Sequence, residues 1–314
     1  MLLSLVLFFV GLFLLYFGAE YLVEGSSRLA LSFGVRPLII GMTIVAFATS
    51  MPELLVTVFA AARGSVDLAV GNVVGSNVAN IGLILGSSAL VAPLTVERTL
   101  LTRELPIMLL ASLLFWLFAL DNHLGLFEGV TLLAGLVGFL YYCISFGRQG
   151  AGLEPLTELD EVKAEQRYRK RDVVYIVGGI VALAIGAECL IKGASTIARA
   201  FGVTELVIGL SVVAFGTSLP ELAASVVSAM KGELELSVGN VIGSNIFNVL
   251  FVIGISCTIH PLPVNPQLHY FQFPAMIIVG ALLFPMLIKS RVINRLHGAI
   301  FVTSYIIFIV VSFL

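Results

Sequence analysis

The sequence predicts an all-α polytopic membrane protein of about ten transmembrane helices, arranged as two inverted-topology five-helix repeats. Three observations support this fold class. The chain of 314 residues is 59% hydrophobic and 11% charged, with a mean hydropathy of +1.08. Apolar stretches long enough to cross a bilayer recur along its length. Two polar motifs of the first half return in the second half.

The composition argues against the other broad classes. A soluble domain carries about 25% charged residues, more than twice the share in this chain, so too little polar surface exists to cover a soluble fold. A net charge of −2 without a large basic cluster gives no surface for nucleic acid. No basic residue precedes Arg28, so we expect the first apolar stretch to be a transmembrane helix rather than a cleaved signal.

Spanning helices need roughly 20 mostly apolar residues. The stretches that meet this length lie near 2–23, 37–62, 67–92, 104–120, 125–147, 173–191, 205–230, 235–259, 271–288 and 297–313. Between them, residues 148–172 form a hydrophilic segment rich in charge. We therefore divide the chain into a first repeat at 1–147, a loop at 148–172 and a second repeat at 173–314.

Lys and Arg residues are distributed unequally between alternate connections. The odd-numbered connections carry about 14 of them and the even-numbered ones about 3. Positively charged connections stay in the cytoplasm. The sequence thus predicts a multi-pass protein of the plasma membrane with a cytoplasmic 148–172 loop and both termini outside.

Both halves contain the same two motifs in the same register. Residues 41–53 match 209–221, and residues 71–80 match 239–248, at an offset of 168. About 21 of the 40 aligned positions that begin at Gly41 are identical, too many for two unrelated apolar helices.

The register also extends outward, since Gly-Ala-Glu occurs at 18–20 and again at 186–188. Each half has an odd number of expected spans, so the second copy enters the membrane from the opposite face. Inverted repeats are typical of secondary transporters that bind their substrate near the midplane.

The first motif places a proline and a glutamate in the middle of an apolar span. Pro52 removes a backbone hydrogen bond and breaks the helix, which frees a carbonyl for another partner. Thr49 and Ser50 share a helix face with Glu53. A mid-membrane carboxylate requires a partner or a wet cavity. The counterparts in the second half are Thr217, Ser218, Pro220 and Glu221.

The second motif adds neutral oxygen atoms. Asn72, Ser76 and Asn80 recur every four residues and line one helix face, as do Asn240, Ser244 and Asn248. Carboxylate, hydroxyl, amide and carbonyl oxygens without His or Cys suit a hard cation such as Ca²⁺ or Na⁺.

Each of these residues also has a purely structural interpretation. Ser and Thr in membrane helices often bond only the carbonyl four residues earlier. Asn72, Asn77, Asn240 and Asn245 either join helices or orient the ligands from behind. Glu20 and Glu188 lie toward span ends, where carboxylates reach the interface.

The two motifs, each present twice, resemble those of the sodium/calcium exchangers of the cation/Ca²⁺ exchanger superfamily, in a prokaryotic-type member. The resemblance implies antiport of Na⁺ against Ca²⁺ by alternating access, with no cofactor and no enzymatic activity. A monomer in the lipid bilayer is sufficient for this function. The first expected span of each half, near 2–23 and 173–191, would slide with the other as a gate.

The resemblance also implies the ion ligands. Glu53 and Glu221 are the central Ca²⁺ ligands, shared with Na⁺, and Asn80 and Asn248 lie at the same level. The peripheral Na⁺ ligands are, in the first half, Thr49, Ser50, Ser76 and the carbonyl of Ala46, and in the second half Thr217, Ser218, Ser244 and the carbonyl of Ala214.

One departure from the family keeps the coupling ion open. Some relatives carry Asp at the position of Asn248, so this chain has two central carboxylates rather than three. An exchanger driven by H⁺ or dependent on K⁺ is the alternative. A passive cation channel and an intramembrane enzyme are the other classes, and no nucleophilic constellation supports the enzyme.

Overall fold

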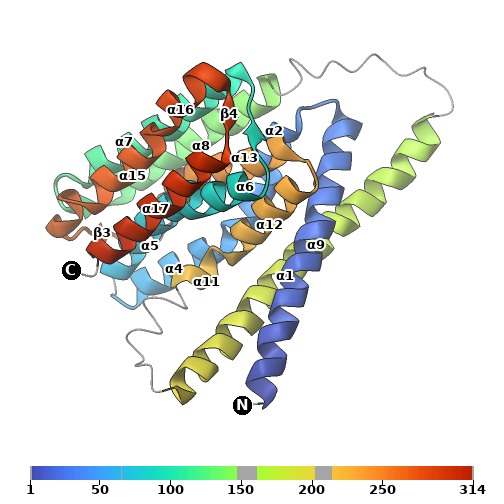
Figure 1. The fold of residues 1–314 in the computed structure, drawn as a ribbon. Coiled ribbons are helices and arrows are strands. Elements are labelled where there is room, and N and C mark those ends of the chain that lie inside the picture. Colours follow the sequence, from blue (N-terminus) through green and yellow to red (C-terminus); the bar gives the residue numbers. More distant parts are fainter. Residues whose placement is uncertain (1, 65, 147–160, 202–213, 313–314) are drawn as a thin grey trace.

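The computed structural model describes residues 2–64, 66–146, 161–201 and 214–312, which form a bundle of helices (Figure 1). Among these residues, eight helices are long and apolar enough to cross a membrane, and a ninth span is added if Pro37–Thr49 and Met51–Ala62, bent by 41°, count as one. The expected span at 205–230 falls in part on 202–213, outside the described residues. The predicted fold class, a helical membrane protein with two repeats, is confirmed.

The first half contains α1 (Leu2–Phe33), α2 (Pro37–Ile40), η1 (Gly41–Val45), α3 (Ala46–Thr49), α4 (Met51–Ala62), α5 (Val66–Ala79), η2 (Asn80–Leu85), α6 (Gly86–Val91), β1 (Leu94–Thr95), η3 (Leu100–Glu104), α7 (Leu105–Ala119), β2 (His123–Leu124) and α8 (Leu126–Phe146). The second half contains α9 (Glu161–Ala200), α11 (Ala214–Thr217), α12 (Leu219–Met230), α13 (Leu234–Phe247), η5 (Asn248–Ile253), α14 (Gly254–Ile259), β3 (Leu262–Pro263), η6 (Pro266–His269), α15 (Gln272–Ala281), α16 (Leu283–Ser290), β4 (Val292–Ile293) and α17 (Arg295–Ser312).

Two helices are longer than the expected spans. α1 continues to Phe33, past the predicted end at residue 23. α9 begins at Glu161, inside the stretch expected to be a loop, while 147–160 lies outside the described residues. Residues 161–171 are mostly Glu, Lys, Ala, Gln and Arg, which are strong helix formers, so charge did not end the helix here.

Elements of the two halves recur at the offset of the sequence repeat. α4 and α12, α5 and α13, and α6 and α14 have bounds that differ by 168 residues. Each of the two small sheets joins the halves, because β1 pairs with β4 and β2 pairs with β3, both antiparallel. In Figure 1, β4 lies near the top of the molecule and β3 lies lower, at its left edge.

The centre of the bundle is α13, in which every residue from Leu236 to Phe247 is buried. It approaches the first half at backbone contact. A Cβ on Gly239 would lie 2.4 Å from the carbonyl oxygen of Leu38, so only glycine allows this crossing.

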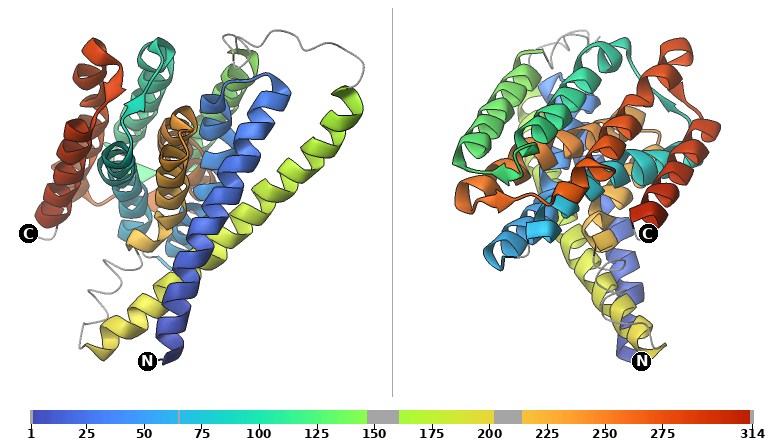
Figure 2. Two further views of the ribbon diagram at one scale, coloured as in Figure 1. Left: turned by 45° about the vertical axis from the view of Figure 1, so that its right-hand side comes forward. Right: turned by 90° about the vertical axis from the view of Figure 1, so that its left-hand side faces the viewer.

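α1 and α9 pack against each other along one side of the molecule (Figure 2). Their contact is a seam of glycines. A Cβ on Gly18 would lie 2.9 Å from Ala182 Cβ, and one on Gly179 would lie 2.7 Å from the Gly18 carbonyl oxygen. Backbones this close leave little freedom between the two helices, which therefore form one rigid pair.

Candidate functional site

The two motif glutamates each begin a helix after a break. α3 ends at Thr49 and α4 begins at Met51, and likewise α11 ends at Thr217 and α12 begins at Leu219. The helix break therefore falls at Ser50 and Ser218, two residues before the prolines expected to cause it. Pro52 and Pro220 then lie in the first turn of α4 and α12, where a missing N–H leaves no bond unmade.

This arrangement gives both carboxylates a favourable helix end. Glu53 and Glu221 stand in the first turns of α4 and α12, where the helix dipole favours negative charge. The preceding short helices end at the same level with their carbonyl groups, which favour a cation. Each break therefore brings a carboxylate at a helix N-terminus next to the carbonyl end of a short helix.

The glutamates are buried within the bundle. Each is only 1% exposed. Glu53 Oε1 accepts hydrogen bonds from Ser218 Oγ at 3.2 Å and from Ser76 Oγ at 3.5 Å. Thr217 interacts with the same carboxylate. Residues of both halves thus meet at Glu53.

Hydrogen bonds cross between the halves at Thr49 as well. Its hydroxyl lies 3.2 Å from Asn240 Oδ1 and 3.4 Å from Ser244 Oγ, both on α13. The sequence-based assignment groups the peripheral ligands by half. In the structure Thr49 of the first half lies beside Ser244 of α13, and Ser218 of the second half donates to Glu53 of the first.

The remaining peripheral positions are the two backbone carbonyls. Ala46 begins α3, and its carbonyl oxygen accepts from Ser50 N at 3.0 Å and from Thr49 Oγ1 at 3.4 Å. Ala214 begins α11. Both therefore lie on the short helices that end at the breaks.

Asn80 and Asn248 occupy equivalent positions, since each begins a π-helical turn, η2 or η5. Such turns are frequent at functional sites because they re-aim side chains. Asn248 Nδ2 donates to Asn77 Oδ1 at 3.1 Å, which leaves its own oxygen free. Neither polar atom of the Asn80 side chain has a partner among the described residues.

Several buried oxygen atoms at this level have no hydrogen-bond partner in the described part of the chain. They are Ser50 Oγ, Glu53 Oε2, Asn80 Oδ1, Asn248 Oδ1 and both carboxylate oxygens of Glu221. An unsatisfied buried polar group costs about 1–3 kcal/mol, more when it is charged. Two carboxylates with neutral oxygens around them fit a dehydrated hard cation. The described residues contain no group of three or more His, Cys, Asp or Glu side chains that could hold a metal, so the two carboxylates here are joined only by neutral oxygens.

The four other asparagines of the motifs make hydrogen bonds to residues of neighbouring helices. Asn72 Nδ2 donates to Thr57 Oγ1 at 3.2 Å, and Asn240 Nδ2 donates to Ser225 Oγ at 2.8 Å, so each ties its helix to the helix that carries a glutamate. Asn77 and Asn245 contact thioether sulfurs: Asn77 Nδ2 lies 3.7 Å from Met276 Sδ, and Asn245 Nδ2 lies 3.5 Å from Met108 Sδ.

The sequence interpretation missed four of these partners. Thr57 and Ser225 follow the two glutamates by four residues, and Met108 and Met276 are 168 residues apart. A search for polar or sulfur-containing residues repeated at that offset would have found them.

A cavity of about 110 Å³ reaches the first break from the side of α9. Its walls are Ala48, Thr49, Met51, Pro52, Leu55, Ile180, Leu183, Ala184 and Pro220. Thr49 both lines this cavity and contacts Asn240 and Ser244 of α13, so it lies between the cavity and the second motif.

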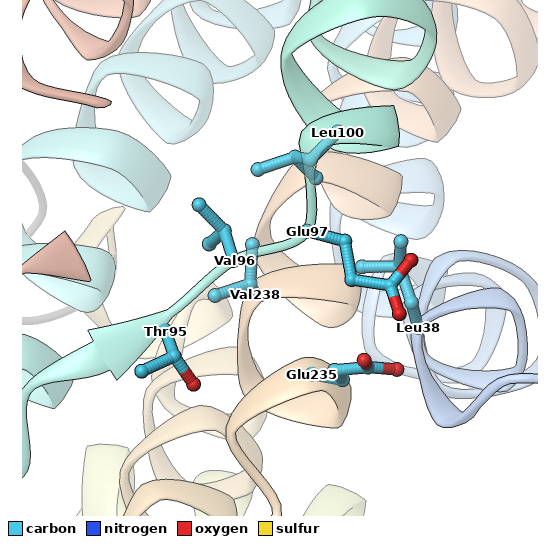
Figure 3. Close-up of a pocket in the computed structure, with 7 residues that line it drawn as sticks. All are labelled: Leu38, Thr95, Val96, Glu97, Leu100, Glu235 and Val238. Atoms are coloured by element: carbon cyan, nitrogen blue, oxygen red, sulfur yellow. The ribbon is translucent and has the colours of Figure 1, made fainter. Parts of the chain in front are cut away.

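A second pair of carboxylates lies apart from this site. Glu97 and Glu235 border a small cavity of about 10 Å³ (Figure 3). Glu97 accepts from Arg36 NH1 at 2.6 Å, and Arg36 also pairs with the buried Glu104 at 3.2 Å. Burial lowers the pKa of Arg36, but these carboxylates raise it more, so Arg36 stays charged. The guanidinium group of Arg36 pairs with both Glu97 and Glu104, so we interpret this cluster as structural.

Comparison with known proteins agrees with the geometry. The sequence description of the sodium/calcium exchanger protein family matches residues 3–145 and 172–314. The chain belongs to this family. Its members are ion exchangers, which excludes the intramembrane enzyme considered from the sequence.

Relatives of this exchanger cover nearly the whole chain. It is 40% identical to CaxA of Alkalimonas amylolytica over 98% of this chain and 97% of that one. It is 32% identical to the sodium/calcium exchanger MaX1 of Methanosarcina acetivorans, over 97% of each chain. Among solved structures, the sodium-calcium exchanger NCX_Mj soaked with zero Na⁺ and Ca²⁺ superimposes with a TM-score of 0.85 at 31% identity, over 98% of this chain and 97% of that one.

Proposed function

We propose that this exchanger moves Ca²⁺ against Na⁺ by alternating access, with the ions bound at the midplane between its two repeats. The observation that carries the proposal is the group of unpaired buried oxygens around Glu53 and Glu221. Two buried carboxylates balance the charge of one Ca²⁺, and the same oxygens can instead be shared among Na⁺ ions. MaX1 and NCX_Mj, which match nearly the whole chain, are named as exchangers of these two ions.

The ligands are assigned by position. Glu53, Glu221, Asn80 and Asn248 hold the central cation. The peripheral cations are held by Thr49, Ser50, Ser76, Thr217, Ser218 and Ser244 with the carbonyls of Ala46 and Ala214. Each peripheral position draws on both repeats, as the contacts of Thr49 and Ser218 with the opposite half indicate.

The cavity beside α9 is the access route in this conformation. It leads to Thr49, whose side chain is part of its lining. In this proposal the exchanger is open on the side of this cavity. Movement of α1 and α9 as a rigid pair past the two breaks closes that side and opens the other.

The layout in the membrane is inverted, with 1–147 and 173–314 as the two repeats. The start of α1 and the end of α17 lie toward one end of the molecule, and the end of α8 and the start of α9 toward the other (Figure 1). With the charged connections inside, both termini are outside the plasma membrane and the segment around 148–172 is cytoplasmic. One chain in the bilayer suffices, because both halves of the site belong to it.

The test is Ca²⁺ uptake into proteoliposomes loaded with Na⁺. Uptake is expected to require internal Na⁺ and to fall about 100-fold or more in Glu53→Gln and in Glu221→Gln. Loss of one buried charged partner costs about 3–5 kcal/mol, which is consistent with a change of that size. Glu128→Gln makes the same chemical change outside the site and is expected to leave uptake intact.

The same vesicles separate the competing interpretations. Uptake that ignores Na⁺ but follows a pH gradient, or that needs K⁺ as well, would replace Na⁺ coupling with the H⁺-driven or K⁺-dependent alternative. Ca²⁺ entry without any counter-ion would indicate a passive channel.

A further inference from the structure

The repeated Gly-Ala-Glu motif places one glutamate on each helix of the rigid pair, Glu20 on α1 and Glu188 on α9. Neither side chain takes part in the ion site. A basic residue follows each of the two helices that carry a site glutamate. Lys231 follows α12, and Arg63 follows α4.

The two basic residues hold equivalent places in the repeat. Lys231 and Arg63 are 168 residues apart, and both end their helix with similar backbone angles, φ −84° and −91°. Each is followed by a glycine with positive φ, Gly232 at 80° and Gly64 at 74°. The sequence therefore contains two possible ion pairs of the same design, Glu20 with Lys231 and Glu188 with Arg63.

Only one of these ion pairs is formed. Lys231 Nζ lies 2.9 Å from Glu20 Oε1, and both side chains are about one-third exposed, at 32% and 31%. Glu188 instead pairs with Lys192 of its own helix at 2.6 Å. The Arg63 side chain makes no ion pair with any residue that the structure describes.

The formed pair lies where α1 and α12 pack together. There α1 packs along α12, and Ser27 Oγ of α1 donates to Glu233 Oε1 at 2.7 Å, two residues beyond Lys231. On the other side, the 110 Å³ cavity separates α9 from the start of α4. The Glu20–Lys231 pair is thus formed where two helices pack together, and the Glu188–Arg63 pair is absent where a cavity separates them.

We propose that Glu20–Lys231 and Glu188–Arg63 are alternative latches, each of which holds one side of the exchanger closed. This inference rests on the alternating access proposed above. When the α1–α9 pair moves, Glu20 leaves Lys231, while Glu188 exchanges Lys192 for Arg63. Partly exposed ion pairs shift an equilibrium by only about two- to fivefold, so each latch biases one state without trapping the transport cycle.

Thiol accessibility tests this proposal without any transport measurement. Cys189 is replaced by serine, since Cys143 and Cys257 are buried. A cysteine is then placed at Ala184, on the cavity wall, or at Ala223, which is the repeat counterpart of the wall residue Leu55. The rate of labelling by a membrane-impermeant maleimide is measured from each side of the vesicle.

Breaking the formed latch should exchange the two accessibilities. In Glu20→Gln, labelling of Ala184→Cys should slow about two- to fivefold and labelling of Ala223→Cys should accelerate by a similar factor. The charge swap Glu20→Lys with Lys231→Glu should restore both rates. Arg63→Met, which disables the other latch, should change both rates in the opposite direction.

Two results would overturn the latch: unchanged rates in Glu20→Gln, or a charge swap that behaves like the single variant. Failure of the transport proposal looks different. If the unmodified chain shows no Na⁺-dependent Ca²⁺ uptake but labelling still responds as described, the latch stands and the assigned ions are wrong.

Discussion

The Asn248 side chain presents its oxygen to the site because Asn77 fixes its amide group. Asn77 Oδ1 accepts the Asn248 N–H at 3.1 Å, while Asn77 Nδ2 is itself oriented by the Asn245 carbonyl at 3.4 Å and Met276 Sδ at 3.7 Å. Without this chain of bonds the amide could turn its NH₂ group toward the proposed cation. Under the proposed function, a neutral amide in this place serves as a defined ligand only through a second asparagine behind it.

Asn77→Leu is expected to raise the Ca²⁺ concentration for half-maximal uptake by about three- to tenfold. The lost hydrogen bond is worth about 0.5–1.5 kcal/mol, which sets this range. The matched control is Asn245→Leu, because the Asn245 side chain makes only the weak contact of Nδ2 with Met108 Sδ at 3.5 Å and does not hydrogen-bond Asn248. Equal effects of both variants on Ca²⁺ affinity would refute a special role for Asn77.

Much of the site could be predicted from single residues, and the part that could not depends on how helices cross. Glu53 and Glu221 stand out because a carboxylate in an apolar span requires a reason. The pairing of Thr49 with Ser244 could not be predicted, since it arises only where α13 passes the first break. Met108 and Met276 carry no sequence signal of polarity, and only the contacts to asparagine give them a role.

At the scale of elements, the sequence predicted most spans but misplaced several helix ends. Hydropathy reports the apolar part of a helix and cannot report where a polar extension stops. α1 therefore continues past its apolar part to include Arg28, which pairs with Glu24 one turn earlier. The π-helical turns that begin at Asn80 and Asn248 were likewise invisible, since one extra residue in a helix turn leaves hydropathy unchanged.

The glycine seam between α1 and α9 leads to a stability prediction. Gly179→Ala should destabilise the protein by about 1–3 kcal/mol, because the added methyl would lie 2.7 Å from backbone atoms of α1. The neighbouring Gly178→Ala is the control, since Gly178 has no described atom within 4 Å of an added Cβ. Thermal unfolding in detergent should show a lower midpoint for the first variant only. A drop of similar size in Gly178→Ala would mean that helix propensity or lipid contact, not the seam, decides the outcome.

At the scale of the whole molecule, the internal repeat accounts for the small sheets, the paired breaks and the two latches together. β1 and β3 are equivalent in the repeat, since they are 168 residues apart. β1 pairs with β4 of the second half, and β3 pairs with β2 of the first half. A parallel arrangement of the halves would place both sheets at the same end, whereas β4 lies near the top of the molecule and β3 lower, at its left edge (Figure 1). This separation favours inversion and makes the orientation of the termini the decisive test.

Fluorescent-protein fusions in a bacterial host measure that orientation, because the fluorophore forms in the cytoplasm and not after export in an unfolded state. A fusion after Leu314 should be dark, and an insertion at 150–155 should be bright. The reason is that about 14 of the 17 basic residues lie on the odd-numbered connections, which include 148–172 and are expected in the cytoplasm. Both fusions should retain Na⁺-dependent Ca²⁺ uptake, which controls for misfolding. A bright C-terminal fusion with a dark insertion would reverse the orientation while keeping the inverted repeat. Two bright or two dark fusions would place both sites on one face, which an odd number of spans in the second half does not allow.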